Sequence, residues 1–220
     1  YAQRELTQIF DFDGSYRDLT TIDVFTTIDT FQQSLVYNID AFENYSIVIG
    51  SDYYNDYREA TAKTLVAGNL VQDNTPHVET NAIAIYVDAT YNFNDRLSLT
   101  AGGRYSFEKK DGYFKSQTGT GAVTFPGTDD SAEWDAFTPR LSLRYNLGPS
   151  SNIYANYSQG FRAGAYNFSG APSPELFKAI NPEEATAYEV GYKTSAARYR
   201  FELAAFYYDY SDIHVGAGVP

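Results

Sequence analysis

The chain has 220 residues, a formal net charge of −12 and no cysteine. The lack of cysteine excludes a disulfide scaffold, a thiolate zinc site and a cysteine nucleophile. The negative charge argues against nucleic acid as a partner, because a phosphate-binding surface needs clustered Lys and Arg. Aromatic residues make up 17% of the sequence, with 21 Tyr and 15 Phe, and this density suits half-buried strands and amphipathic boundaries.

The mean hydropathy is −0.41, and the sequence has no run of the roughly 20 apolar residues that a transmembrane helix needs. A transmembrane barrel remains possible, because only alternate residues of its strands face lipid and the average hydropathy stays low. Neither a signal peptide after Tyr1 nor a terminal aromatic strand before Pro220 is recognisable. We therefore expect both ends to be cuts within a longer protein.

The N-terminal third of the sequence predicts a few strands with less regular patterns. Residues 1–18 predict a strand end and a loop, and residues 20–38 predict one or two strands. A short turn at 40–44 precedes a strand over 44–58, and a long polar connection is expected over about 61–78. In the strand over 44–58, Tyr45, Ile47, Ile49 and Tyr53 alternate around Gly50.

Residues 79–110 show the clearest alternation in the chain and predict two strands joined by a tight turn at Asn94. One face is polar and includes Asp88, Arg104 and Glu108, which a helix would scatter around its circumference. The other face is apolar, with Ile83, Ile85, Val87, Ala89, Tyr91, Leu97, Leu99, Ala101, Tyr105 and Phe107.

The same alternation returns in two later pairs of segments, of which the first turns at Gly148 and the second near Ala196. Tyr flanks each apolar face, as in the aromatic girdles of membrane barrels. The four segments cover residues 137–147, 153–157, 188–193 and 199–208.

Short turns alternate with long polar connections, which we expect over 111–133 and 166–184 as well as 61–78. Outer-membrane barrels have this asymmetry, with tight periplasmic turns and long outer loops, and several strands exceed the roughly 9–11 residues that cross a bilayer. Strands of soluble sandwiches are usually about 5–6 residues long. The sequence therefore predicts an all-β fold, an antiparallel transmembrane β-barrel segment with about eight or nine strands of a larger barrel.

The order and spacing of these segments resemble the barrel of TonB-dependent receptors. The resemblance is clearest over 79–213, and the whole of 1–220 is interpreted as part of one barrel domain. The segments that carry it are 95–105, 137–142, 153–164, 181–184, 188–193 and 205–213.

This resemblance implies a receptor in the bacterial outer membrane that imports a scarce ligand, most commonly a ferric siderophore, with energy delivered by the TonB complex. TonB contacts an N-terminal plug region in the family, and neither the plug nor the TonB-contacting segment is found in this sequence. Large transporter barrels have 22 strands. Because an unclosed sheet leaves unpaired edges, the segment by itself should not transport anything.

Charged residues on the predicted inner face are the first site candidates. Charge-assisted hydrogen bonds from them could hold the plug. Alternatively, they are the mutually paired, solvated interior that any polar barrel requires. These residues are Arg104, Arg140, Arg144, Arg200, Glu189 and Glu202.

Aromatic residues of the predicted outer loops are the second set of candidates. Trp134 and Tyr166 rank first, because such rings can stack on a siderophore or glycan. The alternative for both is girdle or loop packing.

We expect no metal site and no cofactor. Asp129, Asp130 and Glu133 could offer oxygen ligands to calcium but lack the spacing of a calcium loop, and His77 and His214 are expected to be ordinary surface residues. No catalytic constellation or nucleotide fingerprint is present, so the protein is predicted not to be an enzyme. A passive porin with an inward constriction loop remains the alternative, ahead of an outer-membrane hydrolase.

Overall fold

The computed structural model describes residues 1–11, 19–40, 43–168 and 173–215, most of which form one antiparallel sheet. No helix of this described part is long and apolar enough to cross a membrane. The single-turn 3-10 helix η1 covers Pro174–Leu176. The strands are β1 (Ala2–Asp11), β2 (Thr20–Ile39), β3 (Tyr45–Val66), β4 (Asn69–Asn74), β5 (His77–Asn92), β6 (Leu97–Thr118), β7 (Val123–Gly148), β8 (Ser151–Arg162), β9 (Glu183–Ala196) and β10 (Tyr199–Ser211).

Neighbouring strands in the chain are neighbours in the sheet, so the topology is a meander. β4 and β5 share one position, because both lie between β3 and β6. Pro76 separates them, since proline has no N–H to donate to a ladder, although its carbonyl still accepts from the backbone of Ala60. The ten strands of the described residues therefore occupy nine positions of one sheet, which confirms the predicted all-β antiparallel fold and is close to the expected eight or nine strands.

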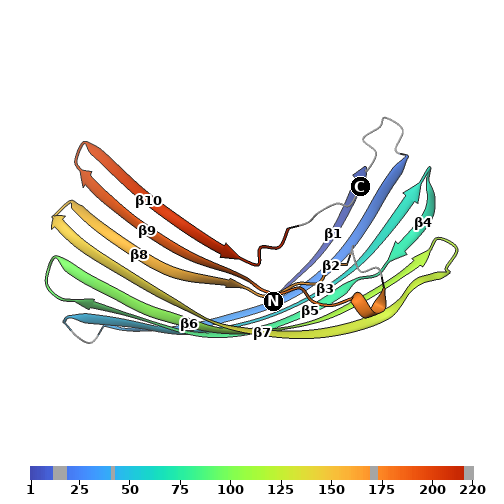
Figure 1. The fold of residues 1–220 in the computed structure, drawn as a ribbon, viewed down its shortest axis with the longest axis horizontal. Helices are drawn as coiled ribbons and strands as arrows, with labels where there is room; N and C mark the ends of the chain where they lie inside the picture. Colours follow the sequence, from blue (N-terminus) through green and yellow to red (C-terminus); the bar gives the residue numbers. More distant parts are fainter. Residues whose placement is uncertain (12–18, 41–42, 169–172, 216–220) are drawn as a thin grey trace.

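The sheet is curved into an open trough, and η1 lies on its concave side (Figure 1). We call the concave side the inner face and the convex side the outer face. The turns 93–96, 149–150 and 197–198 lie at one end, the turn end, as do Asp40, Glu43 and Asn44. The connections 67–68 and 119–122 lie at the other end, the hairpin end, together with the described residues 163–168 and 173–182 that follow β8.

Two of the three predictions of long loops are wrong. The residues expected to form the loop 111–133 instead extend β6 and β7, which pair up to a short turn at 119–122. The residues expected to form the loop 61–78 extend β3 and form β4, with Ala67 and Gly68 turning at φ of 48° and 78°. Of the third, 166–184, the described residues 166–168 and 173–182 lie outside the strands, and β9 begins at Glu183.

In the N-terminal part, residues 20–38 form a single long strand, β2, rather than two. β1 agrees with the expected strand end, while residues 12–18 of the predicted loop and residues 41–42 of the predicted turn lie outside the described residues.

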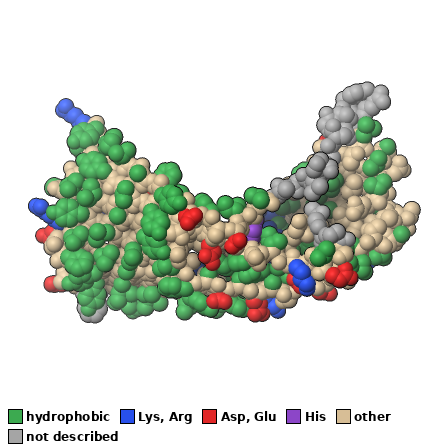
Figure 2. All heavy atoms as spheres, in the orientation of Figure 1, with side chains coloured by type: hydrophobic (Ala, Val, Ile, Leu, Met, Phe, Trp, Pro, Cys, Tyr) green, Lys and Arg blue, Asp and Glu red, His purple; other side chains and the backbone are tan. Residues whose placement is uncertain are grey.

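The outer face carries an apolar band near the turn end, seen as the concentration of hydrophobic side chains on the left of Figure 2. Its side chains are exposed, as Ile85 at 59% and Val190 at 57% illustrate. Exposed apolar surface on this scale is not tolerated in water but suits contact with lipid. On β5 the band runs from Ile83 to Tyr91, close to the roughly 9–11 residues that cross a bilayer at a tilt.

Tyrosine and phenylalanine rings mark both borders of this band. On the side of the hairpin end, the Tyr157 ring lies 5.3 Å from that of Tyr188, which lies 6.4 Å from Tyr207. Near the turn end, the Tyr192 and Phe201 rings lie 6.3 Å apart. Such rows are the aromatic girdles expected where lipid meets water.

Beyond the band, toward the hairpin end, the outer face becomes polar although the strands continue. Lys109 follows Phe107 on this face of β6 and pairs with Asp111 at 3.2 Å. On β5, Asn81 and Glu79 replace the apolar residues and are joined by a hydrogen bond of 3.1 Å. The strand extensions therefore project past the bilayer as hairpins.

Leu141→Arg should impair folding into bilayers, because Leu141 lies at the middle of the band on β7 and a cation at the bilayer midplane costs about 2–4 kcal/mol. Glu133→Arg, on the same strand and face but beyond the band, should cost under about 1 kcal/mol. Urea titration of folding into lipid vesicles measures both, and equal costs would contradict the assigned band.

Candidate functional site

The inner face is polar, and several of its charged side chains form ion pairs with a residue of the same strand. Arg58 pairs with Asp56 at 2.5 Å, and Lys110 pairs with Glu108 at 3.0 Å. Asp56 is only 3% exposed and also accepts a hydrogen bond of 2.7 Å from Thr30. Pairing of this kind offsets the free-energy cost of removing these charges from water on a partly closed wall.

Arg104, one of the predicted inner residues, is the centre of a cluster that spans β3, β5 and β6. Its Nη1 lies 2.5 Å from Asp52 Oδ2, and its guanidinium carbon lies 5.7 Å from the centroid of the Tyr86 ring. Tyr86 in turn covers Gly50, where an added Cβ would lie 2.2 Å from the ring. Arg140, also predicted, pairs with Asp88 beside this cluster.

The other predicted charges lie nearer the turn end, so the structure does not bring all six residues together. Glu189 accepts a hydrogen bond of 2.5 Å from the Tyr154 hydroxyl, and Arg200 pairs with Glu202 at 2.6 Å within β10. Arg144 is exposed on the same face of β7, opposite Tyr154.

Trp134 and Tyr166 both lie toward the hairpin end, where residues 163–168 and 173–182 fold onto the inner face of the β6–β7 hairpin. We call these described residues the inner segment. The Tyr166 ring stacks on Phe177 with centroids 5.3 Å apart. Trp134 lies against Gly164, where an added Cβ would lie 2.4 Å from its ring.

A small aromatic core holds the inner segment in place. Phe114 and Phe125 of the hairpin are buried, and Phe177 of the inner segment is 1% exposed. Phe177 lies 6.2 Å from Phe114 and 6.4 Å from Phe125 between ring centroids. Tyr166 and Phe168 pack against this cluster from the side.

Asp130 is the polar anchor of the inner segment. Its carboxylate accepts hydrogen bonds from the Tyr166 hydroxyl at 3.2 Å, from the backbone N–H of Ala179 at 3.3 Å and from Lys178. Burial, together with the charge and hydrogen bond of Asp130, raises the pKa of Tyr166 well above its ordinary value. The phenol therefore remains a donor throughout the physiological pH range.

The acidic residues 129–133 lie in β7 rather than in the loop that the sequence suggested. Within the described part of the chain, no group of three or more His, Asp or Glu side chains is arranged to hold a metal ion. His77 stacks on Tyr113 at 4.6 Å, and the ring of His214 contacts the carbonyl oxygen of Asn181 at 2.5 Å.

Two open cavities on the inner face form the candidate ligand site. One, of about 330 Å³, lies between Asp52, Tyr54, Arg104 and the start of the inner segment. The second, of about 300 Å³, is bordered by Arg58 and by Tyr166 and Phe168 of the inner segment. Arg58 and Arg104 have side chains that are 53% and 41% exposed, so several of their N–H groups can still donate to a ligand.

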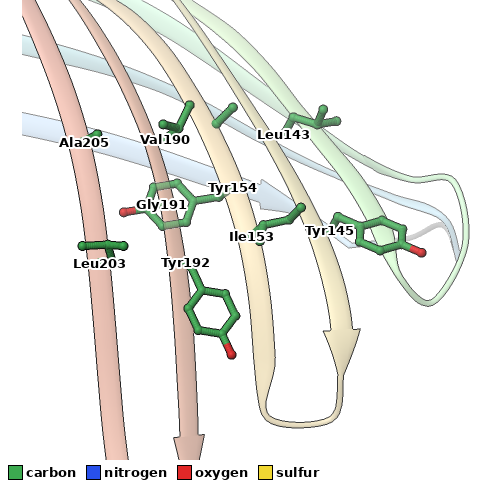
Figure 3. Close-up of a pocket in the computed structure, with 10 residues that line it drawn as sticks. Leu143, Tyr145, Ile153, Tyr154, Val190, Gly191, Tyr192, Leu203 and Ala205 are labelled. Atoms are coloured by element: carbon green, nitrogen blue, oxygen red, sulfur yellow. The ribbon is translucent and has the colours of Figure 1, made fainter.

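A third hollow, of about 490 Å³, lies on the outer face over β7 to β10 and is lined almost entirely by apolar side chains. Leu143, Ile153, Val190 and Leu203 extend into it (Figure 3). These residues belong to the apolar band, so this hollow faces lipid and is not a candidate ligand site.

Sequence reasoning missed much of the inner cluster. Asp52, Asp56 and Arg58 lie on the polar face of β3. The alternation of residues along this strand could have identified them as inner-face residues. Asp52 and its partner Arg104 are 52 residues apart in the chain. Their pairing could therefore be predicted only from the register of the strands.

Gly191→Ala should displace the Tyr154 ring, because an added Cβ would lie 2.4 Å from it. The displacement should also break the contact of Lys193 with that ring, and overpacking of this kind costs about 1–3 kcal/mol. Gly160→Ala is the matched control, since its Cβ would meet only ordinary contacts at 4.0 Å. Thermal unfolding of the two purified variants measures the difference, and equal melting temperatures would contradict the placement of Tyr154.

The sequence matches the family model described as TonB dependent receptor-like, beta-barrel over residues 1–220. It is 29% identical over 158 residues to the rhizobactin receptor of Rhizobium meliloti, covering 60% of this chain and 21% of that protein. It is 28% identical over 139 residues to the metal-pseudopaline receptor CntO of Pseudomonas aeruginosa, covering 62% and 18%. The chain thus spans about a fifth of the length of these curated relatives.

Among solved structures, the ferric yersiniabactin uptake receptor FyuA from Yersinia pestis superposes with a TM-score of 0.83 at 19% identity. The superposition covers 96% of this chain and 32% of that one. At this identity the likeness shows a shared fold.

Proposed function

Because the chain belongs to the family of TonB-dependent receptor-like β-barrels, we propose that it forms part of the wall of a receptor that imports a ferric siderophore with energy delivered through TonB. The receptor lies in the bacterial outer membrane. The TonB complex would act on it through a plug region, and the whole receptor is the transporting unit.

The observation that carries the proposal is the inner segment, which borders the polar inner-face cavities at the hairpin end. A ligand that enters from this end meets Arg58 and Arg104, whose exposed N–H groups suit the anionic oxygens of an iron chelate. Tyr166 and Trp134 offer ring surface in the same region. The relatives named above are receptors for rhizobactin and metal-pseudopaline, which supports the chelate class.

We assign the predicted charges nearer the turn end to plug contacts. Arg144 and Arg200 are exposed there, and Arg140 is exposed beside the Arg104 cluster, so each could donate a charge-assisted hydrogen bond to a plug. The carboxylates of Glu189 and Glu202, on the same face, would accept hydrogen bonds from the plug.

A passive porin is the second candidate, because the inner segment folds inward as a constriction loop would. It packs on Gly112 and Phe114, however, beyond the apolar band rather than at its middle. Swelling of liposomes that contain the complete protein tests this directly, and rapid, ligand-independent sugar flux would favour the porin.

Growth on chelated iron tests the proposed function. A strain that lacks this gene should fail to grow on at least one of a panel of ferric siderophores, and the intact gene should restore growth. Arg58→Ala together with Arg104→Ala should raise the siderophore concentration needed for half-maximal growth by roughly tenfold, since two charged hydrogen bonds are lost. Restored growth on every siderophore by that variant would argue against the inner-face cavities as the site.

A further inference from the structure

Lys110 of β6 joins the inner segment to the wall close to the point where the chain leaves β8. Its Nζ donates a hydrogen bond of 2.7 Å to the carbonyl oxygen of Gly164, and it also forms an ion pair of 3.0 Å with Glu108. The same Nζ lies 5.8 Å from the centroid of the Trp134 ring. The backbone carbonyl of Lys110 accepts a hydrogen bond of 3.3 Å from the Tyr166 hydroxyl. Both the side chain and the backbone of Lys110 therefore hold the inner segment.

The Lys110 side chain is largely withdrawn from water. It is 18% exposed, whereas that of Lys109, its neighbour in the chain on the outer face, is 39% exposed. A lysine is rarely removed from water to this extent unless it is paired. Glu108 already provides the opposite charge, so the hydrogen bond to Gly164 is a further charge-assisted contact. Its effect falls on the position of the inner segment.

Gly164, the acceptor of this hydrogen bond, is buried and enclosed on two sides. An added Cβ would lie 2.0 Å from the carbonyl oxygen of Ile180 and 2.4 Å from the Trp134 ring. Ile180 belongs to the returning arm of the inner segment, and its N–H donates a hydrogen bond of 2.8 Å to Ala165. Because the two arms are joined in this way, the Lys110 hydrogen bond fixes both of them against the wall.

The point at which Lys110 holds the inner segment lies between the two cavities of the candidate ligand site. Lys110 and Glu108 line both cavities. Along the inner segment, Ala163 borders the cavity of about 330 Å³ and Ala165 borders the cavity of about 300 Å³. The chain thus passes from one cavity to the other at Gly164, where the Lys110 hydrogen bond keeps it on the wall.

Resting on the proposed function, we infer that Lys110 is a positioning residue that sets the selectivity of the receptor among ferric chelates. By holding Gly164 on the wall it keeps the two cavities apart, so that a chelate must fit them as separate spaces. Without this hydrogen bond the start of the inner segment can leave the wall, and the two cavities join. Lys110 acts through the inner segment, whereas Arg58 and Arg104 are the residues assigned to contact the chelate. Selectivity is a difference between affinities, so the loss of Lys110 should change the ratio of two Kd values.

The test uses the complete receptor, purified, and three iron(III) chelates that differ in size and shape: the dicitrate, a tris-hydroxamate and a tris-catecholate. Lys110→Met keeps most of the side-chain length but removes the charge and the hydrogen bonds. It should weaken the Kd of the preferred chelate by about tenfold and change the other Kd values less than about threefold, so that discrimination narrows. Lys110→Arg can still donate to Gly164 and should keep the ratios of the Kd values within about threefold of those of the unaltered receptor.

Two further variants separate the position of the inner segment from the charge of Lys110. Lys109→Met is the matched control, because Lys109 lies on the outer face and pairs with Asp111 at 3.2 Å, and it should leave every Kd unchanged. Gly164→Ala alters no charge, but its Cβ would displace the inner segment from the Trp134 ring. We expect it to narrow the discrimination as Lys110→Met does, and it gives the same answer if Lys110→Met fails to fold.

Equal weakening of all three chelates by Lys110→Met would overturn the inference, because a lost charge or a lost stability acts on every chelate alike. Unchanged ratios of the Kd values in Gly164→Ala would also overturn it. Binding of none of the three chelates by the unaltered receptor would overturn the proposed ligand site, and this inference with it.

Discussion

Phe177→Ala is expected to detach the inner segment from the β6–β7 hairpin. Phe177 is 1% exposed and contacts both Phe114 and Phe125, and truncation of a fully buried Phe costs about 3–5 kcal/mol. Because this cost falls on a local contact, it should appear as local opening rather than as global unfolding. Trypsin cleavage after the neighbouring Lys178 in the complete receptor should become about 100-fold faster or more.

Leu176→Ala is the matched control for that experiment. Leu176 precedes Phe177 at the end of η1 but is 62% exposed, so its truncation should change the cleavage rate less than about threefold. Equal acceleration by both substitutions would mean that the aromatic core does not hold the inner segment.

Asp56→Ala is expected to loosen the pairing of β2 with β3. Asp56 is 3% exposed and accepts hydrogen bonds from Thr30 at 2.7 Å and from Arg58 at 2.5 Å. Its removal leaves the half-buried Thr30 hydroxyl without its acceptor and the half-exposed Arg58 side chain without its partner, which costs about 2–3 kcal/mol. Amide hydrogen exchange in β2 and β3 should accelerate by roughly 100-fold.

Asp135→Ala serves as the comparison for Asp56. Asp135 is exposed on the outer face and accepts one hydrogen bond, of 3.0 Å, from Tyr105. Its loss should cost under about 1 kcal/mol and leave the exchange of β6 and β7 nearly unchanged. Exchange in β2 and β3 that is unaffected by Asp56→Ala would contradict the role of Asp56 as the buried acceptor there.

Alternation predicted the membrane-crossing parts of the strands because lipid lies on one side and polar groups on the other. From Ile83 to Tyr91 this contrast is complete, and the predicted faces match the structure. Beyond the band the contrast disappears, since Lys109 and Asp111 face water on the outer side. The strands continue there by backbone pairing without that alternation of apolar and polar residues, and for this reason residues 111–133 were predicted as a loop.

The candidate site was less predictable, because its geometry depends on contacts between distant segments. The sequence alternation placed Arg104 on the inner face, but its pairing with Asp52 depends on how β3, β5 and β6 align. The aromatic residues Trp134 and Tyr166 were recognised as candidates. Their positions beside the inner segment were not, since these depend on the packing of Phe177 against Phe114 and on the hydrogen bond from Tyr166 to Asp130.

The most direct test of the central claim is the initial rate of radioactive iron uptake by cells in which the complete receptor is the route for one ferric siderophore. We predict uptake that saturates with siderophore concentration and falls to background when TonB is deleted. Uptake that continues unchanged without TonB, and rises linearly with concentration, would contradict the account and indicate a passive barrel.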